Sequence, residues 1–213
     1  MAHPGKNGGE TDQQAIDMIQ LDRPLVLASA SPRRQFLMKE AGFAIEIAIP
    51  DADEKFPSEM PVSEVACFLA SRKADSFRKG IGNRIVITAD TVVILDGKIL
   101  NKPADRHEAI SMLQSLSGHT HRVITGVCIL SRERERKFDD TTEVTFRKLS
   151  LEEIEFYIDR CQPFDKAGSY GAQDWIGMVG VERISGSYFN VMGLPMHKVY
   201  QHLSAWATQR PDA

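Results

Sequence analysis

The sequence contains few cysteines. Its 213 residues include only Cys67, Cys128 and Cys161, which lie far apart and form no C-x-x-C pair. Such an odd, widely spaced set is typical of buried thiols in a reducing compartment and argues against a disulfide framework or a zinc site. We therefore expect a cytoplasmic protein.

Long apolar runs and a strong excess of either charge are also absent. No apolar run approaches the length needed to span a bilayer, and the first twenty residues lack the apolar core of a secretory signal. The formal net charge is −3, from 26 Lys and Arg against 29 Asp and Glu, so the basic excess of a protein that coats nucleic acid is missing. We expect neither a membrane nor a nucleic-acid polymer as a partner, and an anion would have to be met by a few cations at one site.

Three familiar catalytic motifs are missing as well. The sequence has no G-x-x-x-x-G-K-[ST] loop, no H-E-x-x-H and no G-x-S-x-G elbow. Any phosphate that binds here is therefore not held by a P-loop.

The length and composition predict one globular domain. Hydrophobic residues make up 42% of the chain and charged residues 26%, which is ordinary for a folded protein. We expect a polar leader over residues 1–22 with at most a short helix around 15–19, a single α/β domain over 23–208, and a tail over 209–213.

Hydrophobic patterning predicts a mixed sheet with flanking helices. A short apolar strand at 24–29 leads into Ser31-Pro32, an N-cap and first-turn signal for a helix that ends at Gly42. Asp96-Gly97 predicts a hairpin, and the segment 132–137 predicts the charged tip between two long antiparallel strands. The remaining elements are expected as strands at 44–49, 84–95, 98–100, 122–130 and 138–149, helices at 63–79, 105–116, 150–159 and 195–206, and a short β region after the loop 165–174.

Arg33 and Arg34 are unusual for their position in the first turn of a helix. The helix macrodipole disfavours cations there, whereas the free backbone N–H groups attract anions. Two arginines behind a strand and a Ser-Pro turn favour a phosphate between the helix and the guanidinium groups. The alternative is that both arginines point to solvent or pair with surface carboxylates.

Asp90 is a carboxylate within a run that is apolar on both faces, Ile85 to Ile94. An unpaired carboxylate in such a strand would cost several kcal/mol, so Asp90 must meet a cation, a metal or a polar cleft. A structural salt bridge and a functional site explain the carboxylate at this position almost equally well.

Lys73 lies on or beside the apolar stripe of the helix predicted at 63–79. It either extends along the core to reach water or projects into a cleft beside Asp90. Lys102 follows the hairpin, next to Pro103, and is a candidate for the same cleft.

Three further candidates depend on their surroundings. Glu54, in an acidic loop, is either solvated or, with Asp90, holds Mg²⁺ or Mn²⁺, which prefer few carboxylates plus substrate oxygens. Gln173 is a loop amide that can donate and accept at a base edge. His119 and His121 lack a second ligand pair, so we interpret them as structural or exposed, not as zinc ligands.

Several segments of the chain, taken in order, resemble the motifs of the Maf family. The resemblance covers about residues 25–203, nearly everything except the leader. The segments are 28–34 (Ala-Ser-Ala-Ser-Pro-Arg-Arg), 89–93, 101–103, 116–118 with 121–123, 165–173 and 186–195.

This resemblance implies a nucleoside triphosphate pyrophosphatase. Such an enzyme cleaves a nucleotide to its monophosphate and pyrophosphate with a divalent metal, Mg²⁺ or Mn²⁺, and removes non-standard or surplus nucleotides. The resemblance also implies an elongated, ITPase-like α/β fold with two lobes around a deep cleft. The expected partner is a small-molecule nucleoside triphosphate. The sequence is compatible with both a monomer and a homodimer.

The resemblance also implies roles for individual residues. Asp90 resembles the general base that activates the attacking water, and Glu54 and Asp90 are the candidate metal ligands. Lys73 and Lys102 complete the polar group around metal and phosphates. The substrate-binding candidates are Ser29, Arg33, Arg34, Thr91 and Gln173, with Ser29 and Arg33 as the triphosphate grip and Arg34 either a second contact or a support behind it.

Base preference is implied by the segment 170–173. Its Tyr-Gly-Ala-Gln form resembles the branch that acts on dTTP and UTP, while Ala172 and Asp174 depart from the isoleucine and glycine that are common there. The alternatives are a pyrophosphatase for 7-methyl-GTP or another modified nucleotide, and a non-catalytic regulator of septum formation. The joint presence of Asp90, Glu54, Lys73 and Lys102 favours an enzyme.

Overall fold

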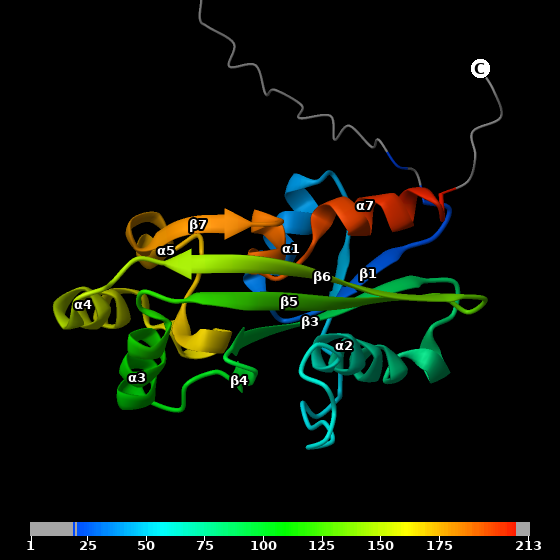
Figure 1. The fold of residues 1–213 in the computed structure, drawn as a ribbon. Coiled ribbons are helices and arrows are strands. Elements are labelled where there is room, and N and C mark those ends of the chain that lie inside the picture. Colours follow the sequence, from blue (N-terminus) through cyan, green and yellow to red (C-terminus); the bar gives the residue numbers. More distant parts are fainter. Residues whose placement is uncertain (1–18, 20, 208–213) are drawn as a thin grey trace, which may run out of the picture.

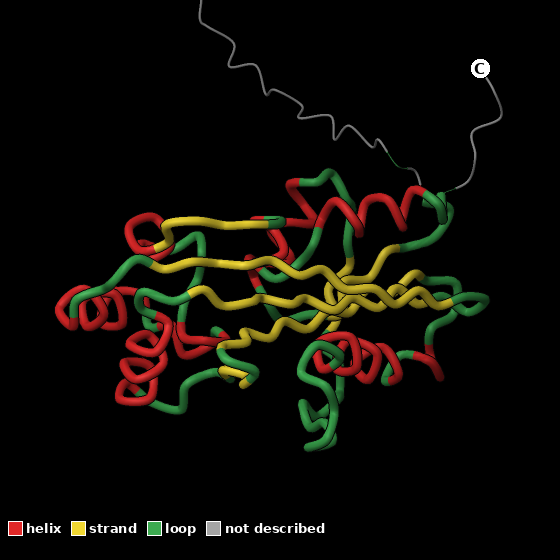
Figure 2. The backbone as a smooth tube through the Cα atoms, in the orientation of Figure 1, coloured by secondary structure: helices red, strands yellow, loops and turns green. Residues whose placement is uncertain are grey.

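The computed structural model describes residue 19 and residues 21–207. The expected leader helix, apart from Ile19, and the expected tail lie outside the described residues. Figures 1 and 2 show an elongated molecule in which helices pack against one twisted sheet. The strands and helices, in order, are β1 (Leu25–Ala28), α1 (Pro32–Glu40), β2 (Glu46–Ala48), α2 (Val65–Asp75), η1 (Arg78–Gly80), β3 (Ile85–Leu95), β4 (Lys98–Leu100), α3 (Arg106–Leu116), β5 (Thr120–Leu130), β6 (Glu135–Phe146), α4 (Leu151–Cys161), η2 (Pro163–Asp165), η3 (Ala167–Ser169), α5 (Trp175–Gly180), β7 (Val181–Ser185), α6 (Tyr188–Met192) and α7 (Met196–Ser204).

The sheet is mixed, as the sequence predicts. Its strands follow the order β2-β1-β3-β5-β6-β7, and β4 pairs with β3. The strand β1 pairs in parallel with both β2 and β3. The pairs β3–β4, β3–β5, β5–β6 and β6–β7 are antiparallel. The predicted α/β class with flanking helices is therefore confirmed, while its division into two lobes stays a prediction.

Alternate residues of β3 pack on opposite faces of the sheet. Ile85, Ile87 and Ala89 contact the cluster that includes residues of α1 and α7, while Val86 contacts residues of α2. Figure 1 shows α7 and α2 on opposite sides of the sheet. Because strand side chains alternate, Asp90 shares the α2 face and Thr91 shares the α1 face.

Among residue 19 and residues 21–207, no strand pairs with the middle of one edge of β3. Along this edge β1 pairs with residues 85–87 and β4 pairs with residues 93–95. The opposite edge is paired with β5 continuously from Val86 to Ile94. Asp90 and Thr91 thus lie at a gap between β1 and β4, where side chains from both faces of the sheet can meet a ligand.

Local capping follows the sequence signals closely. Ser150 and Glu153 form a complete capping box at α4, and Asp105 accepts a hydrogen bond from the Glu108 backbone N–H at α3. Ser31 occupies the N-cap of α1, but its side chain makes no capping hydrogen bond. The N-terminal backbone N–H groups of α1 are therefore not satisfied by the Ser31 hydroxyl.

Several predicted boundaries were wrong. The strand predicted at 44–49 is only Glu46–Ala48, and the helix predicted at 63–79 ends at Asp75, before the separate turn η1. The predicted tip 132–137 is shorter, because the Ser131 backbone N–H donates to the Arg134 carbonyl at 2.8 Å and closes the turn there. The short helices α5 and α6 were not predicted, because they span only six and five residues, too few to show a helical hydrophobic period.

Gly126 on β5 lets α2 pack close to the sheet. It pairs with Asp90 in register, and a Cβ atom there would overlap the backbone of Ala66 and Cys67. We expect Gly126→Ala to lower the free energy of unfolding by about 1–3 kcal/mol, as overpacking does. Urea denaturation measures this, with Gly80→Ala as the control, since a Cβ at Gly80 meets no described residue within 4 Å. Equal stabilities of the two variants would contradict this role.

No helix among residue 19 and residues 21–207 has the length and apolar character to cross a membrane.

Candidate functional site

A cavity of about 740 Å³ lies at the gap in the sheet. It is lined by the turn after β1, the middle of β3, the end of β4 and the loop that contains Gln173. Five cations and three anions line it, although the chain as a whole carries a net charge of −3. The cations are Arg33, Arg34, Lys73, Lys102 and Lys166, and the anions are Glu54, Asp90 and Asp165.

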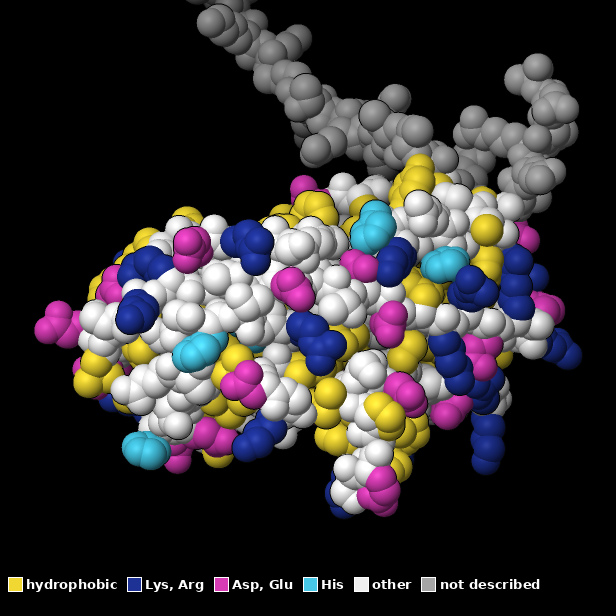
Figure 3. Space-filling view, viewed as in Figure 1, with side chains coloured by type: hydrophobic (Ala, Val, Ile, Leu, Met, Phe, Trp, Pro, Cys, Tyr) yellow, Lys and Arg dark blue, Asp and Glu magenta, His cyan; other side chains and the backbone are white. Residues whose placement is uncertain are grey.

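The cavity lining therefore carries more cations than anions, in contrast to the chain as a whole. On the face in Figure 3, charged side chains of both signs intermingle. A volume of this size is typical of small-molecule sites, and its charge favours an anion as the ligand. The gathering of cations at one site agrees with the sequence analysis, and the binding of an anion there stays a prediction.

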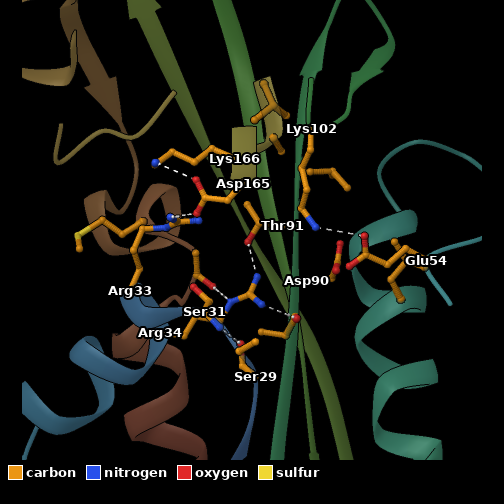
Figure 4. Close-up of a pocket in the computed structure, with 18 of the residues that line it drawn as sticks. Ser29, Ser31, Arg33, Arg34, Glu54, Asp90, Thr91, Lys102, Asp165 and Lys166 are labelled. Carbon is orange, nitrogen blue, oxygen red and sulfur yellow. Dashed lines mark hydrogen bonds and ion pairs between the residues drawn. The ribbon is translucent and has the colours of Figure 1, made fainter. Parts of the chain in front are cut away.

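On the α2 side of β3, two carboxylates share one ammonium group. Lys73 Nζ donates to Asp90 Oδ1 and, at 3.0 Å, to Glu54 Oε1. Lys102 Nζ reaches the other oxygen of Glu54 at 3.3 Å, as Figure 4 shows. Lys73 and Asp90 are both buried, so the sharper sequence alternative, a lysine projecting toward Asp90, is confirmed.

The two lysines also control the ionisation of Glu54. Burial alone would raise the pKa of this carboxyl, but the charges and hydrogen bonds of Lys73 and Lys102 outweigh it and lower the pKa. Glu54 is therefore a carboxylate at neutral pH. Asp90 and Glu54 together present oxygen ligands to the cavity.

On the α1 side, Arg33 faces the cavity and pairs with Asp165. Its NH1 donates to Asp165 Oδ2 at 2.9 Å, and Lys166 Nζ contacts the other carboxylate oxygen at 3.0 Å. Figure 4 shows these three side chains on the side of β3 opposite to Glu54. Ser29 is buried in the preceding turn, where its hydroxyl accepts a hydrogen bond from the Ser31 backbone N–H at 3.2 Å.

Arg34 is turned toward the sheet and held by three hydrogen bonds. Its nitrogens donate to the carbonyls of Gly193 and Ala89, both at 2.8 Å, and to Thr91 Oγ1 at 3.0 Å. Burial lowers the pKa of Arg34, and the charge of Asp90 partly offsets this. Arg34 thus connects the start of α1 to β3. This is the supporting role that the sequence analysis gave as one of two alternatives for Arg34. A direct contact between Arg34 and the substrate stays a prediction.

Thr91 belongs to the same buried network. Its hydroxyl lies 2.9 Å from that of Thr125, which donates to the Asn190 carbonyl at 3.0 Å. The Thr91 side chain therefore positions Arg34, besides lining the cavity.

Gln173 lines the cavity together with Tyr170 and Gly171. Its amide nitrogen donates to Asp174 Oδ1 at 3.2 Å, while its amide oxygen is shielded from water and has no hydrogen-bond partner among the described residues. Successive ion pairs connect this region to α1, because Lys166 contacts both Asp165 and, at 3.6 Å, Asp174.

His121 supports the cavity wall from within. It is buried, stacks on Phe146, and its Nε2 lies 2.7 Å from the hydroxyl of Tyr170. His119 is exposed, and neither histidine belongs to a metal-binding cluster among the described residues. The interpretation of both as structural or exposed agrees with the structure.

Burial of His121 predicts a loss of stability in acid. Burial lowers the pKa of His121 from 6.5 to about 4, so the unfolded chain takes up this proton first as pH falls. The contribution of His121 to stability is therefore fully present above pH 6.5 and is lost as the pH falls toward 4. Between pH 7 and pH 5 we expect the wild type to lose about 2 kcal/mol more than His121→Gln, which urea denaturation at both pH values measures. Parallel losses in the two proteins would contradict this account.

The chain matches the family model described as Maf-like protein over residues 24–206. It belongs to the Maf family. Maf relatives named dTTP/UTP pyrophosphatase are 52% identical in Bacteroides fragilis (strain YCH46), 49% in Porphyromonas gingivalis and 45% in Flavobacterium psychrophilum. The matched regions cover 86%, 84% and 84% of this chain and 96%, 92% and 92% of those proteins.

Sequence reasoning did not single out three residues that shape this Maf site. Asp165 and Lys166 link Arg33 to the loop of Gln173, and Tyr157 on α4 contacts Asp174. The adjacent opposite charges of Asp165 and Lys166 were a usable signal, since they follow Pro163 in a short turn. The contact of Tyr157 with a residue seventeen positions away has no local signal.

Proposed function

We propose that the protein is a cytoplasmic nucleotide pyrophosphatase that hydrolyses dTTP and UTP to the monophosphate and pyrophosphate. The observation that carries this proposal is Asp90, a buried carboxylate held by Lys73 in a cation-rich cavity. The names of the relatives at 45–52% identity support the pyrimidine substrate.

The triphosphate binds between the start of α1 and the lysines on the other side of β3. The N-terminus of α1 attracts negative charge, and the guanidinium group of Arg33 can bind two phosphate oxygens. Phosphate oxygens then compete with Asp165 for Arg33, which the present ion pair holds at the cavity wall. Lys102 supplies a second, more exposed positive charge from the β4 side.

Asp90 is the general base. It takes a proton from water, whose oxygen attacks the α-phosphorus; the bond to the bridging oxygen breaks, and pyrophosphate leaves. Lys73 orients the carboxylate through the ion pair between them. The cations around the phosphates stabilise the negative charge that develops in the transition state.

Glu54 and Asp90 fit a divalent metal that is completed by substrate oxygens. Among the described residues no three His, Cys, Asp or Glu side chains form a metal cluster, so a cage made by the protein alone does not fit. Two carboxylates plus phosphate oxygens are the ligands that Mg²⁺ uses in nucleotide enzymes, and Mn²⁺ accepts the same oxygen donors. When bound, such a metal neutralises phosphate charge and polarises the reacting phosphoryl group.

A nucleotide panel tests this proposal. The purified protein is incubated with dTTP, UTP, CTP, 7-methyl-GTP and ITP, with Mg²⁺, Mn²⁺ or EDTA, and pyrophosphate release is measured. We expect metal-dependent release that is fastest with dTTP and UTP. Preference for 7-methyl-GTP or ITP would favour a modified-nucleotide enzyme, and no release from any nucleotide would favour a non-catalytic regulator.

A further inference from the structure

The carboxylate of Asp174 contacts three side chains, one of which is the amide of Gln173. Its Oδ1 accepts a hydrogen bond from Gln173 Nε2 at 3.2 Å, and its Oδ2 accepts one from the Tyr157 hydroxyl at 2.8 Å. Lys166 Nζ lies 3.6 Å from the same Oδ2. The carboxylate is therefore held on one side by α4 and on the other by the cavity wall.

The surroundings leave Asp174 little freedom. Tyr157 is fully buried, and its hydroxyl also accepts a hydrogen bond from the Gly171 backbone N–H at 3.1 Å. A Cβ atom at Gly171 would lie 2.6 Å from Asp174 Oδ2 and 2.8 Å from Gln173 Nε2. The absence of a side chain at Gly171 thus allows the carboxylate and the amide to pack directly against this backbone.

A fixed carboxylate gives the amide one orientation. A primary amide donates through its nitrogen and accepts through its oxygen, whereas an ionised carboxylate only accepts. Flipping the Gln173 amide would place Oε1 against Asp174 and replace a charge-assisted hydrogen bond by repulsion. In the orientation that remains, one N–H of Nε2 is used by Asp174, and Oε1 is shielded from water without a partner among the described residues. A base that pairs with Oε1 and the second N–H therefore has to reach this shielded position.

We propose that Asp174, which stands in this chain where glycine is common in the dTTP/UTP branch, is a positioning residue that fixes the Gln173 amide and so sharpens the selection of pyrimidines whose N3 carries a hydrogen. This inference rests on the proposed function, because it concerns the base of the nucleotide in the same cavity. Asp174 itself does not line the cavity and acts through Gln173.

The selection follows from the order of donors and acceptors on the base. Uracil and thymine present an N3–H donor beside a carbonyl acceptor, whereas cytosine presents an N3 acceptor beside an amino donor. An amide with its oxygen opposite N3 and its nitrogen opposite the C4 substituent pairs twice with uracil. The same amide faces cytosine with two repulsive contacts, and only a flipped amide pairs with cytosine. The orientation of Gln173 therefore decides between UTP and CTP.

The test compares UTP and CTP in Asp174→Asn. Asparagine has nearly the same shape, but its own amide can accept from or donate to Gln173, so both orientations of Gln173 become available. We expect the ratio of kcat/KM for UTP to that for CTP to fall by at least about tenfold, since a site built to hydrogen-bond its ligand discriminates strongly. The loss should combine slower UTP hydrolysis with faster CTP hydrolysis.

Two further variants separate positioning from structural damage. Asp159→Asn removes a carboxylate of α4, the helix of Tyr157, that pairs with Arg106 and lies outside the cavity, so its ratio should stay within twofold of the wild type. If Asp174→Asn does not fold, Asp174→Ser is measured instead, because serine suits the N-cap of α5 and its hydroxyl also fixes no amide orientation.

The outcomes distinguish the two proposals. A wild type that hydrolyses neither nucleotide overturns the proposed function. A wild type that hydrolyses UTP, together with Asp174 variants that slow UTP and CTP hydrolysis in parallel at an unchanged ratio, overturns the positioning role alone.

Discussion

Asp90→Asn is expected to fold like the wild type and to lose about 10²–10⁴-fold in kcat, the usual contribution of a general base. The asparagine amide has the same shape but cannot take a proton from water, and it is a poor ligand for a divalent metal. Lys73 keeps Glu54 as a partner, so its charge is not left unpaired. The kcat for pyrophosphate release from UTP at saturating metal measures the effect.

Asp139→Asn is the matched control for this variant. Asp139 lies on β6, opposite Gly126, which in turn lies opposite Asp90 on β3. It is exposed and does not line the cavity, so its variant should retain wild-type activity. A folded Asp90→Asn protein with near-wild-type turnover would contradict the assignment of Asp90 as the base.

Lys73→Met is expected to reduce both stability and activity. The methionine replaces the alkyl stem, but Asp90 is then left buried without its cation. Removing one partner of a buried ion pair costs about 3–5 kcal/mol, and we expect a value near the lower end because Glu54 is half exposed and the cavity admits water. Urea denaturation and the kcat for UTP measure the two effects.

The double variant Lys73→Met/Asp90→Asn separates the stability of the pair from its chemistry. It removes both charges, so it should recover much of the stability lost in Lys73→Met and none of the activity. Additive losses of stability in the single and double variants would show that Lys73 and Asp90 are not coupled, against the contact seen in the structure.

The core of the site could be predicted because its residues violate local rules. A carboxylate in an apolar strand and a lysine on an apolar helix face each require a partner, and the structure pairs Asp90 with Lys73. The Ser-Pro turn and the Asp96-Gly97 hairpin have short-range signals, and both lie where the sequence places them.

The rest of the site depends on contacts between distant segments. Arg33 and Arg34 are adjacent in sequence, yet they lie about 100° apart around α1, so one faces the cavity and the other the sheet. The gap between β1 and β4 arises from the pairing of β3 with both strands. Asp174 accepts a hydrogen bond from Tyr157 on α4, and no pattern within α4 or within the loop of Asp174 predicts that contact.

The identity of the reaction products tests the central claim most directly. Phosphorus NMR follows UTP with the wild-type protein and Mg²⁺ or Mn²⁺, with Asp90→Asn under the same conditions. The account predicts UMP and pyrophosphate in equal amounts from the wild type and almost none from the variant. UDP with orthophosphate, or no hydrolysis of UTP by the folded wild type, would contradict it.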